Sequence, residues 1–223
     1  FTLMIMCAGL GSRMLDLTQS IPKPLLEVNN KVLLENTINF FQNFGCDEIL
    51  INTHYLNKTI ENFILESYHD YPIKLIFEPS ILGTGGGIKN IFNYTNRKKI
   101  CVVNSDIFWK DENKKDIINF FKDFKNLNEC KILLSKKENF FGLKKNKGDF
   151  NLNNGIVQKW NESHEVMFYS GLQVIEKDIF QLKNKIFSMS EIWNNLITSQ
   201  KLKGEIMKSN ILHIGDKKSF ENA

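Results

Sequence analysis

The first hundred residues alternate between short apolar runs and amphipathic stretches, and this rhythm restricts the fold more than any other feature of the sequence. Residues 3–8 form a continuous apolar run that ends at Gly9, which is typical of a strand buried on both faces. Over residues 33–44, apolar side chains recur at helical spacing until Gly45. The same patterns predict further strands at 48–53, 73–77 and 100–103, and helices at 59–68 and 83–92.

Strands that alternate with helices in this way are joined by right-handed crossovers and form a mainly parallel sheet. We therefore predict a Rossmann-like α/β fold with helices on both faces of the sheet, built as a single domain over residues 1–223. The later part of the chain adds a predicted helix at 117–124, a strand at 131–135, a β-hairpin within 142–155, a strand at 169–175, a helix at 190–199 and a last strand within 206–214. Ligands of such sheets bind beyond the carboxyl ends of the strands.

Composition and charge argue against several other classes of protein. The net charge is +4 and the lysine runs are short, so we expect no nucleic-acid partner, although the small basic excess helps to attract small anions. The four cysteines lack a C-x-x-C pair, which argues against a zinc site. Cys7 and Cys101 lie in apolar runs and are expected to be buried as small hydrophobic residues, which favours a reducing cytoplasm. No apolar stretch approaches the ~18 residues that span a membrane, and the first residues lack the pattern of a signal peptide.

Two basic residues follow the first predicted strand at positions suited to a phosphate. Residues 9–13 read G-L-G-S-R, and glycines let backbone N–H groups approach a phosphate while Arg13 adds a charged fork of donors. A dinucleotide-binding fingerprint would need a glycine at Met14, so that alternative fails. Prolines on both sides of Lys23 stiffen its backbone, and Lys23 would face the same polyphosphate unless it belongs to an ordinary surface loop.

Two further motifs fall at the ends of later predicted strands. Residues 84–87 read T-G-G-G before a predicted helix, so their N–H groups would face a base or phosphate; a flexible turn is the alternative. Residues 104–106 read N-S-D at the end of a buried strand. A carboxylate at Asp106, beside a polyphosphate, suits magnesium coordination, and the alternative is a cap for the following segment.

These four motifs, in this order, resemble those of the sugar-phosphate nucleotidyltransferase family, which combines a G-x-G-x-R loop, a P-K-P segment, a glycine turn and a strand that ends in N-G-D. The resemblance extends over essentially the whole chain. It implies a nucleotide-diphospho-sugar transferase type of fold, in which the β-hairpin is an insertion that binds the acceptor. Within the family, the short length, G-G-G-I at 85–88, G-D-F at 148–150 and Y-S-G at 169–171 are most similar to the N-acetylmuramate 1-phosphate uridylyltransferases.

The resemblance implies a reaction and a role for each residue that matches a family motif. The two substrates would be a nucleoside triphosphate (UTP first) and a sugar 1-phosphate resembling N-acetylmuramate 1-phosphate. The phosphate oxygen of the sugar would attack the α-phosphorus in line, with Mg²⁺ as cofactor and Mn²⁺ as the alternative. The implied catalytic residues are Arg13, Lys23 and Asp106; the nucleotide-binding residues are Gly9, Leu10, Gly11, Arg13, Lys23 and Gly86; the sugar-binding residues are Asn104, Asp149 and Gly171; and the metal ligands are Asp106 and His213.

The sequence departs from the family pattern at three places. Asp16 replaces a common proline, which predicts a local change of the backbone, and Ser105 replaces the glycine of N-G-D, which predicts crowding at the strand end. His213 stands where the family usually carries a second metal-binding aspartate, and imidazole suits transition metals better than magnesium. Either the metal differs, Asp216 substitutes for the missing aspartate, or catalysis is impaired.

Three functions therefore remain open from the sequence. The first is an active uridylyltransferase, and the second is a guanylyl- or other nucleotidyltransferase acting on mannose or heptose 1-phosphate, which the L-G-T-G-G stretch at 82–86 also suits. The third is a catalytically silent sensor that binds nucleotide sugars, as the histidine at position 213 would allow. Loop motifs do not fix the base, the sugar or the oligomeric state.

Overall fold

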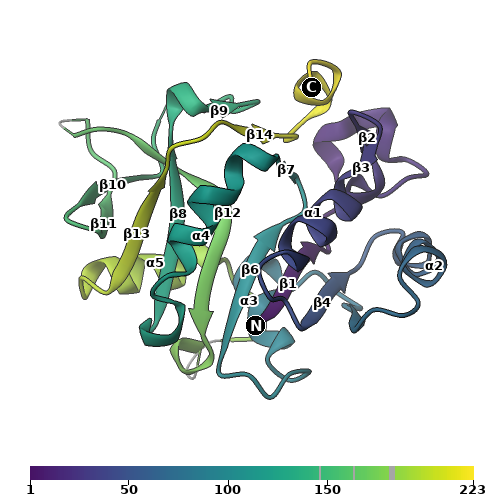
Figure 1. Ribbon diagram of the computed structural model, residues 1–223, viewed down its shortest axis with the longest axis horizontal. Helices are drawn as coiled ribbons and strands as arrows, with labels where there is room; N and C mark the ends of the chain where they lie inside the picture. Colours follow the sequence, from purple (N-terminus) through teal and green to yellow (C-terminus); the bar gives the residue numbers. More distant parts are fainter. Residues whose placement is uncertain (146, 163, 181–183) are drawn as a thin grey trace.

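A nine-stranded sheet runs through the centre of the computed structural model, with the strand order β10-β11-β13-β8-β12-β6-β1-β4-β5 (Figure 1). The structure describes residues 1–145, 147–162, 164–180 and 184–223. The strands of this sheet are β1 (Thr2–Cys7), β4 (Glu48–Thr53), β5 (Ile73–Phe77), β6 (Lys99–Asn104), β8 (Cys130–Lys136), β10 (Phe150–Asn153), β11 (Ile156–Lys159), β12 (Met167–Glu176) and β13 (Leu202–Met207). The strands of this one sheet come from residues 2 to 207, which is why we propose that the chain folds as a single domain.

Short strands and helices complete the described chain. A two-stranded sheet joins β2 (Glu27–Val28) to β3 (Lys31–Val32), and a three-stranded sheet has the order β7 (Ile107–Phe108), β14 (Ile211–His213), β9 (Phe140–Phe141). The α-helices are α1 (Leu33–Gln42), α2 (Asn57–Ser67), α3 (Gly83–Ile91), α4 (Lys114–Phe121), α5 (Met189–Thr198) and α6 (Lys217–Glu221), and the 3₁₀ helices nearest the cavity described below are η1 (Ser12–Thr18) and η2 (Lys23–Leu25).

The prediction of a mainly parallel sheet is right for one half of the sheet and wrong for the other. Strands β6, β1, β4 and β5 are all parallel. β12, however, is antiparallel to both of its neighbours, β6 and β8, whereas β8 and β13 are parallel. β12 is buried along most of its length, and an apolar run of this kind has the same pattern in either direction. The sheet is therefore mixed, and sequence pattern alone did not reveal the reversal.

Helices cover both faces of the sheet, as predicted. Leu34 of α1, Ile60 of α2 and Ile117 of α4 belong to one buried cluster with β1 and β4 side chains that point to that face. Ile88 of α3 and Ile192 of α5 belong to the cluster on the opposite face. Alternate residues of β1 supply both clusters, which is why its whole run is apolar.

The predicted hairpin lies later in the chain than residues 142–155. Its strands are β10 and β11, and the turn between them is formed by Asn154 and Gly155, which have φ angles of 49° and 78°. Positive φ at both central residues is what a two-residue hairpin turn requires, and Asn-Gly is its usual sequence. Strand β13 lies beside β8. The sequence predicted only its last two residues, 206 and 207, as part of a strand.

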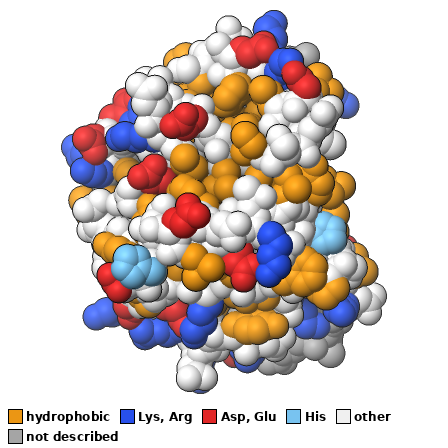
Figure 2. All heavy atoms as spheres, turned by 90° about the vertical axis from the view of Figure 1, so that its right-hand side faces the viewer, with side chains coloured by type: hydrophobic (Ala, Val, Ile, Leu, Met, Phe, Trp, Pro, Cys, Tyr) orange, Lys and Arg blue, Asp and Glu red, His pale blue; other side chains and the backbone are white. Residues whose placement is uncertain are grey.

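Two features concern the possible partners of the protein: the charge on its surface and the apolar character of its helices. On the face shown in Figure 2, basic and acidic side chains are interspersed, and apolar side chains gather in a band through the middle of the face. In the described ranges, no helix combines the length and the apolar character that crossing a membrane would require. Cys7 and Cys101 are buried, as predicted from their apolar surroundings.

Candidate active site

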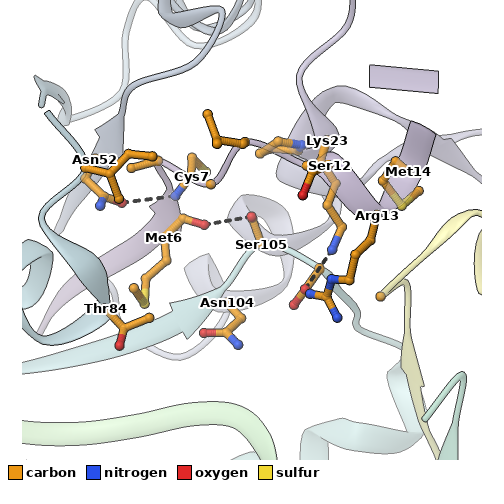
Figure 3. Close-up of a pocket in the computed structure, with 18 of the residues that line it drawn as sticks. Met6, Cys7, Ser12, Arg13, Met14, Lys23, Asn52, Thr84, Asn104 and Ser105 are labelled. Carbon is orange, nitrogen blue, oxygen red and sulfur yellow. Dashed lines mark hydrogen bonds and ion pairs between the residues drawn. The ribbon is translucent and has the colours of Figure 1, made fainter. Parts of the chain in front are cut away.

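A cavity of about 390 Å³ lies at the carboxyl ends of the parallel strands, where the predicted motifs meet (Figure 3). Cys7 ends β1, and Asn52 and Asn104 lie at or next to the ends of β4 and β6. The glycine loop, η1, the Lys23 segment and the start of α3 complete the walls. The cavity is lined by Gly9, Leu10, Gly11, Arg13, Lys23, Asn104 and Asp106, which are seven of the predicted site residues.

The glycine loop turns sharply into η1 because Gly11 adopts a left-handed backbone with φ 67°. A Cβ atom there would lie 3.2 Å from Cγ2 of Thr18, whose hydroxyl donates to the carbonyl oxygen of Gly11 at 3.0 Å. Within η1, Leu15 has a φ of 56°, and Asp16 next to it pairs with Lys217 at 2.7 Å. The backbone is thus kinked next to Asp16, where the sequence departs from the family pattern. Arg13 is exposed at the edge of the cavity.

Lys23 and Asp106 form a largely buried ion pair on the cavity wall. The Nζ atom of Lys23 lies 2.8 Å from Oδ2 of Asp106, and their side chains are only 11% and 16% exposed. Pro22 and Pro24 flank the lysine, and the following 3₁₀ turn closes when the Leu25 N–H donates to the Pro22 carbonyl oxygen at 2.8 Å. The stiff segment therefore aims the lysine at the end of β6, as the paired prolines predict.

His213 approaches the same carboxylate from β14. Its Nε2 atom lies 3.4 Å from Oδ2 of Asp106. Burial alone would raise the pKa of Asp106, but the charge of Lys23 and the hydrogen bond and charge of His213 outweigh it and hold the pKa well below its ordinary value. Asp106 is consequently an anion at neutral pH. A short bond from the Ile214 N–H to the Asp106 carbonyl oxygen, at 2.8 Å, fixes the two segments together.

The side chains around Asp106 could supply a bound cation with only a few of its ligands. Oδ1 of Asp106 is buried and has no hydrogen-bond partner among the described residues, so this oxygen is free to coordinate. The described part of the chain contains no cluster of three or more His, Cys, Asp or Glu side chains suited to a metal. A divalent cation would therefore need phosphate and water oxygens for its remaining positions, as Mg²⁺ bound to nucleotides usually has.

His213 and Asp216 differ in their position relative to Asp106, the predicted metal ligand. His213 contacts Asp106, but it is not among the residues that line the cavity, and its Nδ1 atom is buried with no hydrogen-bond partner among the described residues. Asp216 caps the N-terminus of α6: its carboxylate accepts from the Ser219 N–H at 2.9 Å and pairs with Lys144. These contacts engage Asp216 as a helix cap, which leaves it poorly placed to substitute for the missing aspartate.

Ser105 corrects one expectation from the sequence. The hydroxyl of Ser105 donates to the Met6 carbonyl oxygen at 2.7 Å, and the residue is buried (Figure 3). Instead of crowding the strand end, the side chain ties the end of β6 to β1 beside the cavity. A serine hydroxyl can bond a neighbouring carbonyl group in this way, whereas glycine cannot.

Gly85 and Gly86 also have a different role from the one predicted. The N–H groups of Gly85 and Gly86 both donate to the Phe187 carbonyl oxygen, at 3.1 and 3.2 Å, so they do not face a base or phosphate. A Cβ atom at Gly85 would collide with the Phe187 ring, and one at Gly86 with the Lys185 carbonyl oxygen. The glycines therefore let residues 185–188 pack on α3, and Gly86 lies outside the cavity lining.

Of the predicted sugar-binding residues, only Asn104 lines the cavity. Gly171 lies next to it, since a Cβ atom on Gly171 would lie 3.3 Å from Cβ of Asn104, and its φ of 88° marks an irregularity in β12. Asp149 lies before β10, where it pairs with Lys145 at 2.8 Å and accepts from the Tyr169 N–H at 3.1 Å. Gly171 thus lies next to a cavity residue, whereas both Gly171 and Asp149 lie outside the lining itself.

Sequence reasoning missed two cavity residues, Asn52 and Glu78. Nδ2 of Asn52 donates to Oε1 of Glu78 at 2.8 Å, and Oδ1 of Asn52 accepts from the Cys7 N–H at 3.0 Å. Both side chains are buried, at 2% and 1% exposure. The available signal was their position: each falls at the end of a predicted strand of the parallel half, as Asp106 does.

Comparisons with known proteins show what the chain is similar to. A family model described as nucleotidyl transferase matches residues 2–221. The D-glycero-alpha-D-manno-heptose 1-phosphate guanylyltransferase of Aneurinibacillus thermoaerophilus is 31% identical over 102 residues, 46% of this chain and 44% of the relative. The N-acetylmuramate alpha-1-phosphate uridylyltransferase of Caulobacter vibrioides is 25% identical over 222 residues, 96% of this chain and 91% of the relative. This chain thus spans less than half of the first relative and nearly all of the second.

A solved structure has the same fold. The crystal structure of HddC from Yersinia pseudotuberculosis superposes with a TM-score of 0.78 at 21% identity, covering 100% of this chain and 97% of that one. At this level of identity, the match establishes the fold alone, and the chemistry must be inferred from the residues of the cavity.

Proposed function

The chain belongs to the nucleotidyl transferase family, and from that premise we propose that it joins a sugar 1-phosphate to a nucleoside triphosphate and releases pyrophosphate. The observation that supports this most is the buried pair of Lys23 and Asp106 at the end of β6, beside the glycine loop. It sets a fixed cation next to a carboxylate oxygen that has no hydrogen-bond partner among the described residues. Phosphoryl transfer depends on this combination of positioning and charge neutralisation.

The basic residues have separate tasks in this proposal. The Lys23 ammonium group has three donors, of which one is directed at Asp106, so the others can serve phosphate oxygens. Arg13 is exposed at the edge of the same cavity, where its forked guanidinium suits the outer phosphates. Backbone N–H groups of the loop at Gly9 to Gly11 lie close enough to the cavity to bind the nucleotide.

Asp106 is the proposed ligand of a divalent cation, through its free Oδ1 atom, and His213 is the proposed neighbouring nitrogen donor. When bound, such a cation neutralises charge on the triphosphate. Asn104 and Gly171 would hold the acceptor so that its phosphate oxygen meets the α-phosphorus in line with the departing pyrophosphate. Asp149 would contact the sugar from the β10–β11 hairpin. The protein then supplies orientation and electrostatics, and no protein nucleophile is needed.

Two finer substrate pairs are supported by different relatives. Uridylyl transfer to N-acetylmuramate 1-phosphate is supported by the Caulobacter enzyme, which matches 96% of this chain. Guanylyl transfer to a heptose 1-phosphate is supported by the Aneurinibacillus enzyme, which has the higher identity over a shorter stretch.

Pyrophosphate release tests the proposal. The purified protein is incubated with Mg²⁺, each nucleoside triphosphate and a panel of sugar 1-phosphates that includes N-acetylmuramate and mannoheptose 1-phosphates. We expect pyrophosphate to appear only when both substrates are present, together with an equal amount of nucleotide sugar. Nucleotide binding without turnover for every pair would favour the silent sensor.

A further inference from the structure

Two residues after Arg13, the backbone of η1 makes a sharp kink. Leu15 has a φ of 56° and a ψ of −123°, a conformation that residues other than glycine rarely adopt. The Leu15 side chain is 66% exposed, so its own packing does not hold this conformation. Arg13 is exposed at the edge of the cavity, and its direction depends on the backbone between Gly11 and the kink. The contacts that hold η1 therefore decide where the guanidinium group lies.

Three contacts hold η1, and one of them comes from a residue near the other end of the sequence. The Thr18 hydroxyl donates to the Gly11 carbonyl oxygen at 3.0 Å, which closes the loop on itself. The hydroxyl of Tyr55, just after β4, donates to the Thr18 carbonyl oxygen at 3.0 Å. Asp16, directly after the kink, pairs with α6: Nζ of Lys217 lies 2.7 Å from Oδ1 of Asp16. This last contact joins residues that are 201 positions apart.

The helix that carries Lys217 is firmly anchored beside the cavity. α6 packs against η1, although the two elements lie at opposite ends of the sequence (Figure 1). Asp216 caps α6, and its carboxylate also pairs with Lys144 in the segment after β9. Ile214, just before α6, belongs to the same buried cluster as Met14 of η1. Lys217 therefore holds Asp16 from a fixed support.

The pair of Lys217 and Asp16 is charged at neutral pH but is exposed to solvent. The hydrogen bond from Lys217 lowers the pKa of Asp16 below its ordinary value, and the same bond raises the pKa of Lys217. The side chains of Asp16 and Lys217 are 62% and 33% exposed. An ion pair in this setting contributes little to the free energy of unfolding. Any role of the pair must therefore be local to η1.

Asp16 is also one of the places where the sequence departs from the family pattern, which commonly has proline here. A proline ring restricts the backbone by itself, whereas an aspartate restricts it only through a contact with another group. Lys217 provides such a contact, and the described structure gives the Asp16 carboxylate no other side-chain partner. The order of the backbone at the kink thus depends on α6 in this chain.

We propose that Lys217 is a positioning residue for nucleotide binding: through its ion pair with Asp16 it fixes the kink of η1 and directs Arg13 at the triphosphate. This inference rests on the proposed function, in which Arg13 binds the outer phosphates. Lys217 does not line the cavity, so it acts through η1 instead of touching the nucleotide. A guanidinium group that is already in place loses less conformational freedom when the nucleotide binds, which strengthens binding.

Calorimetric titration of the full chain with UTP and with GTP, in the presence of Mg²⁺, tests the inference without an acceptor sugar. Lys217→Met removes the ammonium group and keeps the apolar stem. We expect the Kd of the triphosphate that the wild type binds more tightly to rise about three- to fivefold, the scale of an exposed ion pair. Asp16→Asn should have the same effect. Lys218→Met is the matched control, because Lys218 is the next residue of α6 and lies in no ion pair of the described chain.

Two further comparisons separate positioning from general stabilisation. In an Arg13→Ala background, Lys217→Met should weaken binding no further, because the ion pair acts through Arg13. The exchange Asp16→Lys with Lys217→Asp restores an ion pair of opposite direction, and it should recover most of the affinity that either single change loses. Thermal unfolding followed by circular dichroism should show a Tm within about 4 °C of the wild type for Lys217→Met.

The outcomes distinguish this inference from the proposed function. An unchanged Kd for both Lys217→Met and Asp16→Asn would overturn the role of Lys217 and leave nucleotidyl transfer standing. The same would follow from an equal loss in Lys218→Met, or from an undiminished effect of Lys217→Met in the Arg13→Ala background. If the wild type binds neither triphosphate, the proposed function and the inference both fail.

Discussion

The two ends of the cavity each carry a buried carboxylate, but the groups around the two carboxylates differ in kind. Asp106 lies against the ammonium group of Lys23 and the imidazole of His213, and one of its oxygens has no partner among the described residues. Glu78 is held by the neutral donors Asn52 and the Leu82 N–H. Both carboxylates follow the carboxyl ends of parallel strands, so the backbone places them in the same way.

The difference shows how one sheet edge supports two tasks. A carboxylate beside a largely buried cation stays ionised and suits charge neutralisation during phosphoryl transfer. A carboxylate that accepts only neutral donors suits the recognition of neutral donors on a ligand. Substitutions at the Asp106 end should therefore affect the chemical step, whereas those at the Glu78 end should affect ligand binding.

The largest expected effect is from Asp106→Asn, which keeps the shape of the side chain and removes its charge. We expect kcat to fall at least ~10²-fold, the scale of removing a preorganised charge-stabilising group. Steady-state pyrophosphate release gives the measurement, and circular dichroism checks the fold. Asp111→Asn, an exposed aspartate that pairs with Lys114, is the control. Near-normal turnover of a folded Asp106→Asn protein would remove this carboxylate from the mechanism.

Lys23→Ala and Arg13→Ala should each weaken triphosphate binding and slow turnover. We expect about 10- to 10²-fold in kcat/KM for Lys23 and less for the exposed Arg13, since charge-assisted bonds are strongest when buried. The double variant should lose less than the product of the two single losses, because both act on one polyphosphate. Two single variants that both behave as wild type would disprove the phosphate assignment of this end.

Asp149→Ala should raise the KM for the sugar 1-phosphate about tenfold or more and leave the KM for the nucleotide nearly unchanged. Asp149 lies outside the cavity lining, before the β10–β11 hairpin. Lys145→Ala removes its salt-bridge partner and separates a direct role from a positional one, since only a positional role predicts the same defect. A selective loss of nucleotide affinity would show that the wrong half of the pocket had been assigned to the sugar.

His213→Asp should have the smallest effect, a change of a few-fold in the ratio of magnesium- to manganese-supported activity. Imidazole offers a nitrogen and no charge when neutral, and manganese accepts nitrogen more readily than magnesium does. An aspartate should therefore raise the ratio. Metal titrations of both proteins, at a pH that keeps imidazole neutral, give the comparison. An unchanged ratio would mean that His213 acts only through its contact with Asp106.

The sequence predicted the end of the cavity that holds Lys23 and Asp106 better than the end that holds Asn52 and Glu78. Gly11, Lys23 and Asp106 carry signals that are local in the chain: a glycine turn, a pair of prolines and a carboxylate after an apolar strand. Glu78 and Asn52 also fall at the ends of predicted strands, but their pairing depends on the order of β4 and β5 in the sheet and on a hydrogen bond across 26 residues. Tertiary pairing of this kind leaves no periodic trace in the sequence.

The same reason explains the errors in the fold and at the glycine turn. Periodicity identified most helices and strands, yet the direction of β12 is set by its neighbours, and its buried run is compatible with either direction. Gly85 and Gly86 are sites of close approach between backbone segments. Their partner is a segment one hundred residues later in the chain, which no local pattern could identify.

The most direct test of the central claim follows the oxygen that attacks the α-phosphorus. A sugar 1-phosphate labelled with ¹⁸O in its phosphate group is incubated with the protein, Mg²⁺ and the preferred nucleoside triphosphate, and both products are analysed by mass spectrometry. In-line attack by the sugar phosphate predicts that all the label remains in the nucleotide sugar and that the pyrophosphate carries none. Label in the pyrophosphate, or release of nucleoside monophosphate without any nucleotide sugar, would contradict the account.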